Sequence, residues 1–176
     1  MKKTKPRKLN HMMWATHYTL MDVLMASPTQ PMSADKRRHQ LTRMWGSLAE
    51  IESGDNPTND DWRVCSDAVN LLETLITKGP WKDCEGDMVE LQDSSGLLMD
   101  AITALAECGQ RARKGHPLRL SGKGMQALRA VLEDYSAAVE HLPQRTMIQC
   151  HIATQKRVQE ILRGKSLPHD VVVIAI

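Results

Sequence analysis

The chain has 176 residues and a net charge of +2, a length that suits one domain able to bury a core without disulfides or metal. Its apolar residues include no Phe, two Tyr and four Trp against eleven Met. This composition favours helices, because strands are enriched in aromatic and β-branched residues. The four cysteines lie far apart with no paired spacing, so we expect reduced thiols and a cytoplasmic protein.

No stretch of the sequence has the length and hydropathy of a membrane span. Residues 9–25 are interrupted by Asn10, His11, His17 and Asp22, and the apolar residues 171–176 are too few to cross a bilayer. We therefore expect no membrane partner.

Charge is strongly separated along the chain. Residues 1–49 carry a net charge of +7, residues 50–107 carry −11 and residues 108–176 carry +6. An acidic middle between basic ends favours a function in binding charged macromolecules.

The first nine residues are predicted to be a flexible basic arm. A first helix is expected from Asn10 and ends at Ser27, because Pro28 and Pro31 interrupt the next segment. Its apolar face would be Met13, His17, Leu20 and Leu24.

The next two predicted helices have clear end signals. Ser33 is a good N-cap for a helix over residues 34–53, and Gly54 is typical of a helix end. The helix after it is predicted to begin near Thr58 and to end at Lys78. The inner stripes would be Leu41, Met44, Trp45, Leu48 and Ile51, then Trp62, Cys65, Val69, Leu72 and Ile76.

A fourth helix is predicted from about Asp87 to Arg113, weakened at Ser94-Ser95-Gly96, where a kink or break is expected. Its aligned apolar positions are Leu91, Leu98, Ile102 and Leu105.

Residues 121–142 have the most regular helical pattern in the chain. Apolar residues recur there at intervals of three and four, so we expect this helix to be the one around which the others pack. The stripe consists of Met125, Leu128, Leu132, Tyr135, Val139 and Leu142. Pro143 ends it, and a sixth helix is predicted over residues 144–163.

The sequence thus predicts an all-α fold, a single-domain bundle of five to six helices over residues 10–165, with a short extended C-terminal tail over residues 166–176. Because the β-branched tail has no partner strand in the chain, it could pair with a second copy in a homodimer, pair with another protein, or lie in a groove.

No motif for catalysis, a cofactor or a metal is present. Gly122-Lys123-Gly124 is too short for a phosphate-binding loop, and no Cys or His pair has ligand spacing. Cys150, His169 and Asp170 supply the residue types of a nucleophilic site without any pattern to hold them together. We expect a protein that is not an enzyme, with no catalytic residue, cofactor or metal.

The acidic middle favours a protein partner with a basic surface. Carboxylates between Glu50 and Glu107, many of them on the outward faces of the third and fourth predicted helices, would form the binding face. The predicted residues are Glu50, Glu52, Asp60, Asp61, Asp67, Glu73, Glu90, Asp93 and Asp100.

The basic ends favour the alternative, nucleic-acid binding or regulation through phosphate contacts. This alternative requires the fold to gather three basic clusters on one surface. They are Lys2, Lys3, Lys5, Arg7 and Lys8; then Lys36, Arg37 and Arg38; then Arg111, Arg113, Lys114, Arg119 and Lys123.

Two segments also suggest a family. The arm ending K-P-R-K-L-N and the C-terminal pattern MQALRAVLEDY…RTMIQCHIATQKRVQEILRGK resemble small uncharacterised helical proteins of proteobacterial phages and plasmids. The resemblance implies a mobile-element protein that acts by binding a host or phage macromolecule, and it assigns no functional residue.

Overall fold

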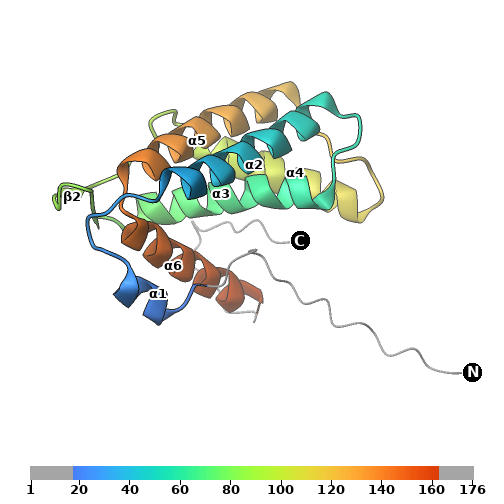
Figure 1. Cartoon of the computed structure of the whole chain (residues 1–176). Coiled ribbons are helices and arrows are strands. Elements are labelled where there is room, and N and C mark those ends of the chain that lie inside the picture. Colours follow the sequence, from blue (N-terminus) through green and yellow to red (C-terminus); the bar gives the residue numbers. More distant parts are fainter. Residues whose placement is uncertain (1–17, 163–176) are drawn as a thin grey trace, which may run out of the picture.

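The computed structural model describes residues 18–162, and within them the chain is a helical bundle with one small hairpin (Figure 1). The all-α prediction is confirmed. The elements are α1 (Leu20–Met25), α2 (Ala34–Ser53), α3 (Asn59–Lys78), β1 (Trp81–Lys82), β2 (Met88–Val89), α4 (Leu98–Arg113), α5 (Gly122–His141) and α6 (Gln144–Leu162). The predicted arm, residues 10–17 of the predicted first helix and the tail lie outside the described residues, so the dimer hypothesis stays a prediction. Within the described part, the first helix begins only at Leu20, because Thr19 is its extended N-cap.

Local end signals place α2 and α3 where the sequence predicts them. The Ser33 side chain accepts a hydrogen bond from the backbone of Lys36, and Gly54 ends α2 in the left-handed conformation at φ 68°. Thr58 and Asp61 form a reciprocal capping box at the start of α3. Each of these contacts spans three or four residues and needs no tertiary partner.

The central helix is α3, and the expectation that α5 holds this place is wrong. α3 packs against α2, α4, α5 and α6 (Figure 1), and every residue from Cys65 to Leu75 is buried. Asp67, Asn70 and Glu73 interrupt its apolar pattern and are buried with the rest. α5 has the cleaner stripe because one of its faces stays in water, whereas α3 is covered nearly all round.

α4 and α5 cross at very short range. A Cβ atom placed on Gly124 of α5 would lie 2.7 Å from the Cβ of Ala104 in α4. The Trp62 indole of α3 donates a hydrogen bond to the Leu105 carbonyl at 3.0 Å, which ties α4 to the central helix. The glycine in the first turn of α5 thus serves helix packing.

α4 begins at Leu98, eleven residues later than predicted. The Asp93 carboxylate accepts a hydrogen bond from the Leu98 backbone at 3.0 Å, and Gly96 is left-handed at φ 66°. Residues 81–89 instead form an antiparallel hairpin in which Trp81 pairs with Val89 and Lys82 with Met88. The expected weak point at residues 94–96 therefore lies just before the helix, where the Asp93 carboxylate binds the backbone of the first helical residue.

α1 lies against α6, apart from the α2–α5 layer (Figure 1). The Arg145 side chain of α6 donates to the Val23 carbonyl at 2.8 Å, and the rings of Tyr18 and His151 are 5.1 Å apart. No helix within residues 18–162 is long and apolar enough to cross a membrane.

Candidate binding surfaces

The predicted acidic face includes two residues that are not on a surface. Asp67 is 8% exposed and Glu73 is 4% exposed. Burial raises the pKa of Glu73 in spite of an ion pair with Arg157 of α6 at 2.7 Å, and burial raises the pKa of Asp67 well above its usual range. Both residues belong to the core, because other helices cover the side of α3 that the sequence predicted to face water.

The acids at the α2–α3 turn are engaged with neighbouring cations. Asp60 forms an ion pair with Arg43 at 3.2 Å, and Glu52 forms one with Arg129 of α5. Asp61 is the capping residue of α3. Glu50 is exposed close to this group at the end of α2.

The remaining predicted acids lie elsewhere. Glu90 directly follows β2, which lies at the opposite end of the bundle from the α2–α3 turn (Figure 1), and Asp93 accepts a hydrogen bond from the first residue of α4. Asp100 forms an ion pair with Lys123 at 3.0 Å. The nine predicted acids therefore do not form one acidic face.

The basic clusters are also separated. Lys36, Arg37 and Arg38 lie in the first turns of α2, whereas the Arg119 side chain lies beside Gly54, just past the end of α2. A helix of twenty residues is about 30 Å long, so these two clusters occupy opposite ends of the bundle. The third cluster also contains Arg111, Arg113, Lys114 and Lys123, and the first, Lys2 to Lys8, lies outside the described residues.

Acids and bases that are far apart in the sequence alternate in space where α2, α3 and α5 meet. Arg119 and Arg129 approach the same helix end that carries Glu50 and Glu52. Packing has thus brought acids and bases that are far apart in the sequence next to one another at this end of the bundle.

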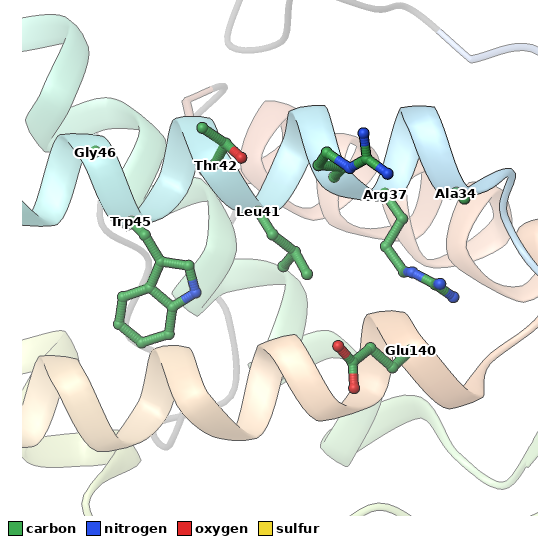
Figure 2. Close-up of a pocket in the computed structure, with 8 residues that line it drawn as sticks. Ala34, Arg37, Leu41, Thr42, Trp45, Gly46 and Glu140 are labelled. Carbon is green, nitrogen blue, oxygen red and sulfur yellow. The ribbon is translucent and has the colours of Figure 1, made fainter.

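A basic groove of about 650 Å³ lies between α2 and α5 (Figure 2). The Trp45 and Leu41 side chains extend from α2 toward α5, and Glu140 of α5 enters the gap between the helices. Arg37 and Arg38 line the same groove, as do Ala34, Thr42 and Gly46. Cationic, aromatic and acidic side chains therefore meet on one concave surface.

A second groove, of about 690 Å³, lies between α1, the hairpin and α6. Its apolar lining comes mainly from α1, the segment after it and the hairpin. The lining residues are Val23, Leu24, Pro28, Pro80, Trp81, Lys82, Met88, Arg145, Thr146 and Gln149.

Two residues of this lining, Leu24 and Met88, are exposed to water, as are three more apolar residues of α1. We call the five residues the α1 patch: Leu20, Met21, Leu24, Met25 and Met88. Their exposed fractions run from 58% for Met88 to 82% for Met25. Exposed large apolar residues that cluster on one region are typical of interaction sites. Methionine is especially suited to such surfaces because its side chain is flexible and polarisable.

Among residues 18–162, no cluster of three or more Cys, His, Asp or Glu side chains could hold a metal ion. Burial raises the pKa of Cys65 and of Cys150 to about 12, and the Cys150 thiol donates to the Leu71 carbonyl. Burial lowers the pKa of His151 to about 4, whereas His141 is exposed and contacts the Ala137 carbonyl. Cys150 is thus a structural thiol at neutral pH.

The chain was compared with family models, curated proteins and solved structures, and none of them matches it. Its function must therefore be argued from its own surfaces.

Sequence reasoning missed the α1 patch, although a signal for it is present. Four of the six residues of α1 are Leu or Met, arranged as two adjacent pairs, Leu20-Met21 and Leu24-Met25. A helix that buries one face needs only one residue of each pair. The second apolar residue of each pair therefore indicates an additional contact surface.

Proposed function

We propose that this chain is a non-enzymatic protein-binding module and that the α1 patch with its adjoining groove is the docking site. The observation that carries the proposal is a groove lined by the exposed side chains Leu24 and Met88, with further exposed Leu and Met side chains on the same short helix α1. Helix-in-groove recognition uses this combination of exposed apolar side chains and a lined concave surface.

This proposal places the binding energy on apolar contact instead of on charged helical faces. Charged side chains such as Asp60, Glu52 and Asp100 already have partners within the chain, and exposed ion pairs contribute little free energy to binding. Residues buried at the centre of an interface carry most of its affinity. The resemblance to phage and plasmid proteins suggests a host or phage protein as the partner.

Site-specific photo-crosslinking tests the proposal. A benzophenone amino acid is placed at Leu24 in the patch or, as a control, at Met99, an exposed methionine of α4. After irradiation in a nuclease-treated cell lysate, we expect discrete protein adducts at position 24 that excess wild-type chain competes away. Adducts of equal yield and identity at both positions would contradict the proposal.

The second candidate function is nucleic-acid binding in the α2–α5 groove. Arg37 and Arg38 could contact phosphates while the Trp45 indole stacks on a base. Glu140 in the same groove and the ion-paired acids at the far end of α2 oppose a long basic track. We therefore rank this function below protein binding.

Tryptophan fluorescence separates the two functions. Nucleic-acid binding predicts quenching by a single-stranded oligonucleotide at low salt, lost in Arg37→Glu/Arg38→Glu and kept in Lys156→Glu, which changes an exposed residue of α6. Deleting residues 1–9 shows whether the basic arm contributes. An unchanged spectrum at low salt eliminates this function.

A further inference from the structure

Resting on the proposed function, we infer that the partner segment is basic and amphipathic: an apolar face that fills the α1–hairpin groove, followed by Lys or Arg side chains that meet the hairpin turn. The inference concerns the chemistry of the partner and combines an apolar groove with charge complementarity at its edge.

The apolar half of the argument comes from the groove. Leu24 lines it from α1, and Trp81 and Met88 line it from the two strands of the hairpin. The Trp81 indole is fixed by donation to the Leu75 carbonyl at 2.6 Å, and Arg145 holds α1 through the Val23 carbonyl. The walls are therefore positioned before a partner arrives, which reduces the entropy cost of binding.

The electrostatic half comes from the turn of the hairpin. Asp83, Glu85 and Asp87 place three carboxylates within five residues, directly beyond the Lys82–Met88 pair that borders the groove. The turn is fixed by a hydrogen bond from the Asp87 backbone to the Asp83 carboxylate at 2.8 Å. Besides burial, Glu85 and Asp83 raise the pKa of the Cys84 thiol, which is the effect of negative potential at this turn.

The turn lies beside the segment that connects α1 to α2. A Cβ atom on Gly86 would lie 3.9 Å from the Thr29 methyl group, and Pro28 lines the groove. Asp22 on α1 and Glu90 after β2 add two more carboxylates around the patch.

Cations near the groove do not cancel this field. Lys82 and Arg145 line the groove itself, and Lys78 is exposed at the end of α3. Arg145 is already engaged by the Val23 carbonyl. Within residues 18–162, five carboxylates and three cations lie around the groove, so this part of the described surface is negative, and an acidic partner segment or an anionic lipid surface fits it less well than a basic segment.

Two synthetic peptides of equal length test the inference: one of Leu and Lys with Leu at helical spacing along one face, and its Leu and Glu counterpart. Fluorescence anisotropy with the full chain is expected to show at least about tenfold tighter binding of the Leu/Lys peptide. Leu24→Ser/Met25→Ser should weaken this binding about tenfold, and Glu85→Lys/Asp87→Lys should reverse the preference between the peptides.

Matched variants on α4 control for each change. Met99→Ser removes another exposed methionine, and Glu107→Lys reverses an exposed acid far from the hairpin in the sequence. Both variants should bind the Leu/Lys peptide as the wild type does. All of the altered side chains are in water, so circular dichroism should show native helix content throughout.

Three results overturn the inference in different ways. Equal affinity for both peptides, still weakened by Leu24→Ser/Met25→Ser, removes the charge preference and leaves the proposed docking site intact. Identical losses in the patch and α4 variants remove the docking site as well. Sedimentation with anionic vesicles but binding of neither peptide assigns the patch to a lipid surface.

Discussion

The Arg157–Glu73 ion pair makes a quantitative prediction about the α3–α6 interface. The two side chains are 10% and 6% exposed and their charged atoms lie 2.7 Å apart. Arg157 also donates to the Asn70 carbonyl at 3.3 Å. Replacing Arg157 with Ala leaves Glu73 buried without its cation, a change that costs about 3 kcal/mol of unfolding free energy or more.

The pH dependence of the loss follows from the carboxyl group. The folded-state pKa of Glu73 lies above its unfolded value because burial outweighs Arg157. Stability from this residue is therefore fully present below the unfolded pKa and is lost as pH rises through the folded pKa. Removing Arg157 raises the folded pKa further, so the Arg157→Ala deficit should be larger at neutral pH than at a pH near the unfolded pKa of Glu, about 4.3.

Urea denaturation of the full chain at both pH values measures the effect. Lys123→Ala is the matched control because it breaks an exposed ion pair, with Asp100, and should cost less than about 1 kcal/mol. The double variant Arg157→Met/Glu73→Leu should recover most of the lost stability, since it removes both charges together. A loss below about 1 kcal/mol for Arg157→Ala, or one independent of pH, would refute the reasoning.

Three further predictions concern the core. Asp67→Asn should stabilise the protein at neutral pH by on the order of 1 kcal/mol, because burial raises the pKa of Asp67 and makes its charged form costly in the folded state. The substitution should have little effect in acid, below the unfolded pKa of Asp, and denaturation at the two pH values checks both expectations. Gly124→Ala should destabilise by about 1–3 kcal/mol because its Cβ would overlap that of Ala104, and Ala104→Gly in the same chain should restore thermal stability. Iodoacetamide should alkylate Cys84 in the native protein much faster than Cys65, because Cys65 is buried and burial raises its pKa to about 12. Mass spectrometry of timed digests measures the two rates, and equal rates would contradict this expectation.

The α1 patch has consequences for handling the protein as well as for its function. Exposed apolar residues such as Leu20 and Met25 favour self-association at high concentration. The same Leu24→Ser/Met25→Ser variant that tests partner binding should reduce any such association. Sedimentation of both proteins over a concentration series separates this effect from a dimer formed through residues 171–176.

Interactions close in the sequence made the helix ends predictable. Ser33 with Lys36, Thr58 with Asp61 and Ser121 with Gly124 each form a cap between residues three apart. These contacts are present in any fold that contains the helix. The prediction failed for α4 because Asp93 and Gly96 formed a stop where the apolar spacing suggested continuity.

The candidate site was less predictable because charge along a chain is not charge in space. The sequence identified Arg37 and Arg38, which do line a groove, but it could not show that Glu140 shares that groove. It also placed Asp67 and Glu73 in water. Their burial depends on how the neighbouring helices cross α3, and no pattern within α3 contains that information.

The sequence by itself determined an all-α chain and the bounds of α2, α3, α5 and α6 to within one or two residues. Periodicity and capping are short-range properties, so they can be read residue by residue. Only the tertiary structure decided that α3 is central, that acids and bases far apart in the sequence lie next to one another across α2, α3 and α5, and that α1 keeps its Leu and Met side chains in water. Each of these three features depends on which helices pack against one another, and that is determined by contacts between segments far apart in the sequence.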